Sequence, residues 1–134
     1  MKPDARDGQI LQHIIEYCHQ INDTIRTFGR REAQFTGNHI YRSAVSMDIM
    51  QIGELCKHLS QDCRNEYDEI NWKDIAGMRD HFAHGYQSMD WGVIWETAIN
   101  DIPKLLQSCT KILQEWSLPI PQEHEITEDR GIMR

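Results

Sequence analysis

The sequence predicts an all-α protein, an up-and-down bundle of four to five helices that works as a homodimer. Apolar residues recur at three- and four-residue steps over four long stretches, which is the spacing of one helix face. Asn, Asp and Gly, which suit helix ends, stand at the borders of these stretches. No stretch shows the alternation of a half-buried strand, so helices are expected to build the core.

The first predicted helix runs from Asp7 to about Phe28, and Gly29 is placed to end it. After a short polar link, the second runs from about His39 to Ser60. Its apolar residues cover more than one side. We therefore expect this helix either at the centre of the bundle or in a subunit interface.

The third predicted helix begins at Trp72 and reaches about His84, where Gly85 stops it. Asn71 is placed as its N-cap, and the side chain of Asp74, three positions on, can form the reciprocal hydrogen bond of a capping box. Helical apolar spacing after this turn predicts one more long helix.

Asp90 is the expected cap of that fourth helix, which continues to Trp116. Pro103 should kink it, because proline removes a hydrogen bond and crowds the preceding turn. The remaining residues have too little apolar content to fold separately. The sequence thus predicts one helical domain, residues 1–116, and a flexible tail, residues 117–134.

Composition restricts the function. A net charge of −7 argues against a protein that coats nucleic acid nonspecifically, so any RNA contact should be local, and no DNA partner is expected. The chain has no apolar run long enough for a bilayer and no export signal at its start. Its four scattered cysteines favour neither a disulfide framework nor a zinc site. A cytoplasmic protein is the expectation.

The segment from Arg79 to Tyr86 carries the candidate chemistry, with Asp80, His81 and His84 between them. Arginine grips phosphate through its planar fork, and histidine moves protons near neutral pH. RNA supplies its own nucleophile, the 2′-hydroxyl, so cleavage needs a base, an acid and a cation, but no metal. Arg79 suits the cation, and His84 suits the base or the acid.

Two proton transfers need two groups, and one chain offers a single best-placed histidine. At about 100° per residue, Arg79 and His84 lie roughly 140° apart on a helix, whereas Tyr86 returns to nearly the side of Arg79. A two-fold dimer that brings two such helix ends together would form one groove with two arginines and two histidines. This arrangement supplies the missing group.

The six residues from Arg79 to His84 resemble the R-x4-6-H motif of HEPN-domain ribonucleases. With Gly85 and Tyr86 they give R-x4-H-x-Y, the pattern of HepT-like toxins. The flanks are similar too, at residues 52–54, 72–78 and 90–103. The resemblance extends from the first helix to about Leu113.

The resemblance implies an all-α dimer with its cleft at the interface, and a toxin that cuts tRNA or mRNA without metal or cofactor. It also implies a minimal nucleotidyltransferase as antitoxin, which attaches AMP to the motif tyrosine. Arg79 and His84 would then be catalytic, Asp80 and His81 supporting, and Tyr86 modified. Many relatives carry Asn where Asp80 stands, and a carboxylate repels phosphate, so the role of Asp80 stays open.

Other interpretations remain. The chain could be a catalytically silent HEPN module that binds a nucleotide or a nucleotidyltransferase, or a helical adaptor in which the motif is incidental. Asp80, His81 and His84 could hold a metal, although close further ligands are lacking. Glu54 is expected to be exposed to solvent. Three tryptophans at helical spacing are expected in the core or an interface rather than as platforms for bases: Trp91, Trp95 and Trp116.

Overall fold

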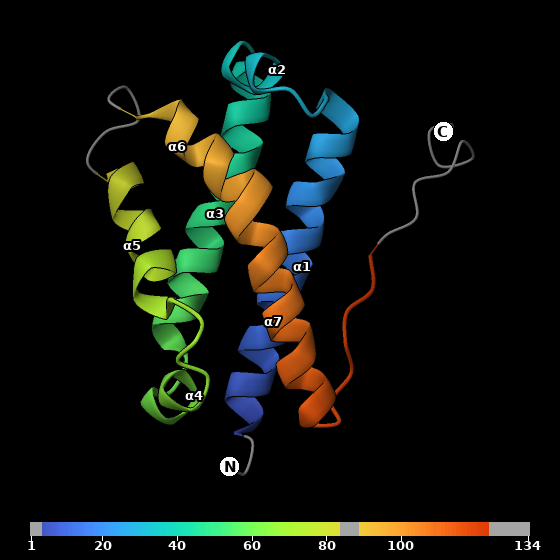
Figure 1. Cartoon of the computed structure of the whole chain (residues 1–134), viewed down its shortest axis with the longest axis vertical. Coiled ribbons are helices and arrows are strands. Elements are labelled where there is room, and N and C mark those ends of the chain that lie inside the picture. The colour runs from blue at the N-terminus through green and yellow to red at the C-terminus, as the bar shows by residue number, and fades with distance from the viewer. Residues whose placement is uncertain (1–3, 84–88, 124–134) are drawn as a thin grey trace.

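A computed structural model describes residues 4–83 and 89–123, and this part of the chain is helical throughout its regular structure. The long helices alternate in direction, so the predicted all-α, up-and-down architecture is confirmed (Figure 1). Their bounds are α1 Ala5–Phe28, α3 His39–His58, α5 Trp72–Ala83, α6 Trp91–Glu96 and α7 Ile102–Glu115.

Both ends of α1 follow from the sequence. The Asp4 carboxylate accepts a hydrogen bond from the Arg6 amide at 2.8 Å, which satisfies a free donor of the first turn. Gly29 ends the helix with φ 111°, in the region that favours glycine. Between these ends α1 presents a continuous apolar stripe to α3 and α7: Ile10, Leu11, Ile14, Ile15, Cys18, Ile21 and Ile25.

Two short helices occupy links that the periodicity did not resolve. These are α2, Glu32–Thr36, and α4, Gln61–Glu66. Each is too short for a periodic stripe and is held by one buried side chain, Phe35 in α2 and Cys63 in α4. Tertiary packing rather than local propensity therefore forms them.

A buried carboxylate joins the start of α1 to the start of α4. Asp7 is 2% exposed and accepts two hydrogen bonds from Ser60, from its amide at 2.8 Å and its hydroxyl at 2.6 Å. The Ser60 hydroxyl in turn accepts from the Cys63 amide at 3.1 Å, as an N-cap does. This network fixes the end of the bundle opposite α2 (Figure 1).

The fourth predicted helix is continuous but not uniform. A π-helical turn, Thr97–Asp101, joins α6 to α7, and Pro103 lies in the first turn of α7. Proline has no N–H and its ring crowds the carbonyl four residues before it, so a wider turn relieves both conflicts. The sequence predicted a kink at Pro103, and the helix is irregular just before this residue, where the π-helical turn lies.

Residues 117–123 lie along α1. The Gln12 amide donates to the Pro119 carbonyl at 2.9 Å, and Nε2 of His19 lies 3.1 Å from the Pro121 carbonyl. Arg26 pairs with Glu123. The sequence predicted a flexible tail over residues 117–134 and did not indicate these contacts; residues 124–134 of that tail lie outside the described part.

The four cysteines are buried as free thiols. Loss of solvent raises the pKa of Cys56 and Cys63 to about 12 and also raises the pKa of Cys18 and Cys109 above the usual thiol range. They therefore act as small apolar side chains in the core. None of the described helices combines the length and apolar character needed to cross a membrane.

Candidate functional site

Helix α5 positions the motif, and Asn71 caps its start as predicted, although the reciprocal bond of a capping box, from the Asn71 backbone amide to the Asp74 side chain, is replaced by another. The Asn71 side chain accepts from the Asp74 amide at 3.2 Å and donates to the Asp74 carboxylate at 2.7 Å. The reciprocal contact therefore runs between the two side chains. A Cβ added at Gly77, midway along the helix, would meet nothing within 4 Å, so this part of α5 is not crowded.

The described part of the motif reaches Ala83. Arg79 lies by its backbone in the second half of α5, Asp80 is exposed, and Phe82 is half-buried against the core. The side chains of Arg79 and His81 are outside the described part of the structure, as are His84, Gly85 and Tyr86 in full. The meeting of Arg79 with His84 therefore stays a prediction.

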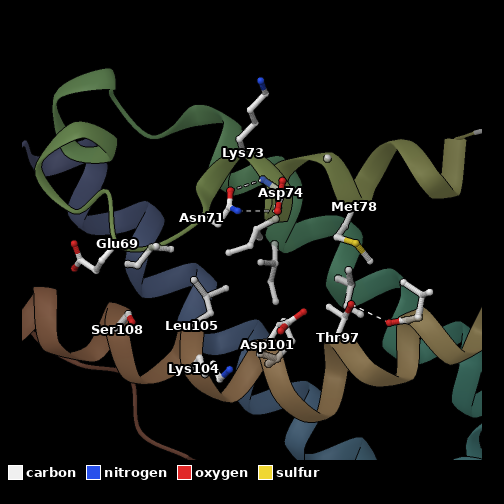
Figure 2. A pocket seen from close by; sticks show the side chains of 17 residues that line it. Glu69, Asn71, Lys73, Asp74, Met78, Thr97, Asp101, Lys104, Leu105 and Ser108 are labelled. Atoms are coloured by element: carbon white, nitrogen blue, oxygen red, sulfur yellow. Dashed lines mark hydrogen bonds between the residues drawn. The ribbon is translucent and has the colours of Figure 1, made fainter.

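An apolar groove of about 720 Å³ runs beside α5. It opens between α5 and the α6–α7 helix, with α3 beneath (Figure 2). Met78 and Leu105 point into it from opposite walls, whereas Lys73 points away. Its apolar lining residues are Ile49, Ile52, Ile70, Ile75, Met78, Val93, Ile102 and Leu105. Its rim carries both signs of charge: Glu69, Lys73, Asp74, Asp101 and Lys104.

The start of α6 lies against α2 and α3. Asp90 caps α6 as predicted, since its carboxylate accepts from the amides of Gly92 at 3.1 Å and Val93 at 3.3 Å. Trp91 follows, and the Arg42 guanidinium lies 5.2 Å from its ring centroid. This distance permits a cation–π interaction. Sequence spacing alone could not reveal this pair, because its members are 49 residues apart.

The other tryptophans agree with the expectation for the core. Trp95 is 7% exposed and packs with Phe35 and Tyr41, at centroid distances of 5.4 and 6.1 Å. Trp116 is partly buried, and its indole N–H donates to the Tyr67 hydroxyl at 3.0 Å. Trp91 differs from both because it contacts an arginine and begins the helix that follows the motif in the sequence.

Two further carboxylates are relevant to the electrostatics. Glu54 lies 3.0 Å from His58 on α3 and is half-buried, so the solvent exposure expected for it is found only in part. Asp48, which the sequence analysis did not single out, is 7% exposed, and burial raises its pKa to about 7. Among residues 4–83 and 89–123, no group of three His, Cys, Asp or Glu side chains is placed to hold a metal ion.

Comparison with known proteins places the chain in a family. The family described as Ribonuclease HepT-like matches residues 10–112. A candidate RNase of Caldanaerobacter subterraneus is 31% identical over 105 residues, which cover 78% of this chain and 92% of that protein.

Two further relatives are similar. One, from Thermococcus cleftensis, is named as a candidate ribonuclease HepT and is 41% identical over 62 residues, covering 46% of this chain and 56% of that one. The other, from Methanocaldococcus jannaschii, is named as a gamma-glutamylcyclotransferase and candidate RNase. It is 36% identical over 105 residues, 78% of this chain but 46% of that protein. No solved structure matches. This chain therefore belongs to the HepT-like ribonuclease family.

Proposed function

We propose that this protein is the toxin of a toxin–antitoxin pair and that it cuts RNA without a metal ion, as a homodimer. The observation that carries the proposal is the family match, because residues 10–112 include the whole R-x4-H-x-Y pattern from Arg79 to Tyr86. Within that pattern Arg79 and His84 act in catalysis, Asp80 and His81 support them, and Tyr86 is the site of control.

The chemistry proposed for the motif is internal transesterification. The 2′-oxygen of the substrate attacks the adjacent phosphorus while a His84 imidazole takes its proton. The bond from phosphorus to the 5′-oxygen breaks, and a second imidazole, from the partner subunit, protonates that oxygen. Arg79 stabilises the crowded, negatively charged phosphorane. The products are a 2′,3′-cyclic phosphate and a 5′-hydroxyl, with no net change in protons.

Apolar surface beside α5 supports the proposed dimer. Val93, on the groove wall, is 48% exposed. A second copy would cover this surface, and the mixed charges of the rim allow an interface that is its own complement about a two-fold axis. Such a contact along α5 would bring two motif ends toward the same axis.

Purified protein is expected to cut RNA with EDTA present, and Arg79→Ala and His84→Ala should each lower kcat by at least about a hundredfold. Lys111→Ala and His58→Ala are matched controls, since they remove one cation and one imidazole from exposed positions outside the groove and should leave the rate unchanged. Cleavage that persists in both motif variants, or that requires magnesium, contradicts the proposal. Intact RNA combined with tight nucleotide binding would favour a silent module.

The composite site can be tested by mixing. Arg79→Ala and His84→Ala subunits, combined after mild dissociation, should form mixed dimers that keep one arginine and one histidine. These dimers should cut RNA faster than either variant alone. The mass in solution should equal two chains. A monomeric mass in an active preparation would reject the shared site.

We further propose that a nucleotidyltransferase antitoxin silences the toxin by attaching AMP to the Tyr86 hydroxyl. In this step the tyrosine oxygen attacks the α-phosphorus of ATP, and pyrophosphate leaves. The bulky anionic group would obstruct the groove and repel RNA phosphate. Incubation with the enzyme and ATP should add AMP masses to the wild type and none to Tyr86→Phe. An equal gain on both proteins would place the modification elsewhere.

A further inference from the structure

Positive charge is concentrated in one part of this acidic chain. Between Asp23 and Asp48 the sequence has four arginines and one acidic residue, Glu32, whereas the rest of the chain has ten basic and twenty acidic residues. Arg26 is neutralised by Asp23 and Glu123. The other three are Arg30, Arg31 and Arg42, and we call them the arginine surface.

The turn after α1 holds two of these arginines at the end of the bundle formed by α2 (Figure 1). Gly29 is fixed there because its carbonyl accepts a hydrogen bond from the Tyr41 hydroxyl at 2.8 Å. Arg30 and Arg31 follow and are exposed. Burial raises the pKa of Tyr41, and the charge of nearby Arg30 acts in the opposite direction. Arg30 thus lies close to the start of α3.

Arg42, the third cation, is fixed in place. Its guanidinium donates to the Thr36 carbonyl and lies over Trp91. Its Nε is buried and has no hydrogen-bond partner in the described part of the chain. An unpaired buried donor costs free energy, which the contacts of Arg42 with Thr36 and Trp91 partly offset.

Arg42 contacts the residue that begins α6, and α6 follows the motif in the sequence. Trp91 is the first residue of α6, and the segment before it carries His84 and Tyr86. In the described part of the chain, two carboxylates lie at the first turn of α6. Asp90 caps it, and Glu32 Oε2 lies 3.5 Å from the position that a Cβ on Gly92 would occupy. The positive helix end partly offsets their charge.

We propose that the arginine surface binds the phosphates of the RNA strand on one side of the cleaved bond, and that it guides this strand into the motif. This inference rests on the proposed ribonuclease function. Arg30 and Arg31 supply exposed charges, and Arg42, set against Trp91, supplies a rigid one. Together they explain how a protein of net charge −7 holds RNA locally.

The test compares Arg30→Ala/Arg31→Ala with Lys57→Ala/Lys111→Ala, which removes the same charge from exposed positions toward the opposite end of the bundle. In the double arginine variant, KM for a single-stranded 20-mer should rise about tenfold and kcat should stay unchanged. A dinucleotide, too short to reach the surface, should be cut equally by all forms. The lysine pair should match the wild type.

Binding measured without cleavage separates this proposal from the proposed function. Affinities for the labelled 20-mer can be measured by fluorescence anisotropy at several salt concentrations. The slope of log affinity against log salt concentration should be shallower by about 1.4 in the double arginine variant, because two phosphate contacts are lost. Glu32→Gln should tighten binding. Arg42→Ala should weaken it, and Arg42→Lys should restore part of the loss, which a purely structural role of Arg42 would not produce.

Two outcomes would overturn the proposal. One is that the double arginine variant binds the 20-mer as tightly as the wild type does. The other is that the double lysine variant loses as much affinity for the 20-mer as the double arginine variant. If the protein cuts no RNA but its affinity for RNA depends on these arginines, the proposed ribonuclease function is wrong and the proposed RNA-binding surface is supported. If RNA dissociates at a given salt concentration while an acidic protein stays bound, the proposal is also wrong, because the surface then binds a protein partner.

Discussion

Asp48 is an acidic side chain held inside the bundle. It lies on the buried side of α3 and contributes to the raised pKa of Cys18, so it faces α1. No hydrogen bond to its carboxylate is found within the described part of the chain, and burial raises its pKa from 3.8 to about 7. Near neutral pH the folded state therefore holds a charge that it solvates poorly.

This charge predicts a pH-dependent stability. Because the pKa is higher in the folded state, the folded protein binds more protons between pH 4 and 7, and its free energy of unfolding should fall as the pH rises through that window. Asp48→Asn removes the effect. The variant should match the wild type near pH 4 and be more stable by up to about 4 kcal/mol above pH 7, as measured by urea unfolding.

Asp62→Asn is the control for this measurement, since Asp62 is exposed in α4 and its substitution should not alter the pH profile. A constant difference between Asp48→Asn and the wild type from pH 4 to 8 would show that Asp48 is solvated or paired in solution.

At the scale of elements, the four long helices could be predicted within about two residues, but α2 and α4 could not. Long helices show their buried stripe in the sequence, and Asn71 and Asp90 mark their starts. In α2 a single side chain, Phe35, provides the buried contact, with Tyr41 at 5.2 Å and Trp91 at 6.1 Å. Such contacts depend on the tertiary structure, which local patterns do not contain.

The turn before α2 depends on Gly29. At φ 111° and ψ 154° other residues are strained, and an added Cβ would lie 2.1 Å from Oε1 of Gln34, the atom that accepts from the Arg31 amide. Gly29→Ala should therefore lower the free energy of unfolding by about 1–3 kcal/mol. Gly77→Ala, in open helical surroundings, should instead raise it by about 0.5–1 kcal/mol. Thermal and urea unfolding measure both, and equal effects would contradict the argument.

Parts of the candidate site were accessible from the sequence to different degrees. The motif from Arg79 to Tyr86 is local, so its residue types and spacing could be recognised directly. The contact of Arg42 with Trp91 arises only when α2 packs against α3 and α6. The groove beside α5 likewise depends on how far the helices separate, which periodicity does not specify.

At the scale of the whole molecule, residues 117–123 extend the bundle beyond the matched family region, residues 10–112. Leu118 and Ile120 are half-buried against the core, and Leu118 lies so close to Gly8 that a Cβ there would approach it to 2.6 Å. The segment therefore covers one side of α1 over most of its length through Gln12, His19 and Arg26.

Removing this cover should destabilise the fold. A chain that stops at Trp116 loses two half-buried apolar side chains and the contacts to α1, so its free energy of unfolding should drop by roughly 2–4 kcal/mol. A chain that stops at Glu123 keeps every described contact and serves as the control. Thermal unfolding compares the two. Equal midpoints would mean that residues 117–123 do not cover α1 in solution.

The path of residues 117–123 also determines how the protein can be labelled. Helix α1 begins at the end of the bundle away from α2 and, with 24 residues, extends about 36 Å toward the arginines (Figure 1). A fluorophore or purification handle attached directly ahead of α1 therefore begins far from the surface proposed for RNA. One joined directly after Glu123 begins beside Arg26, in the last turn of α1, and would crowd incoming nucleic acid.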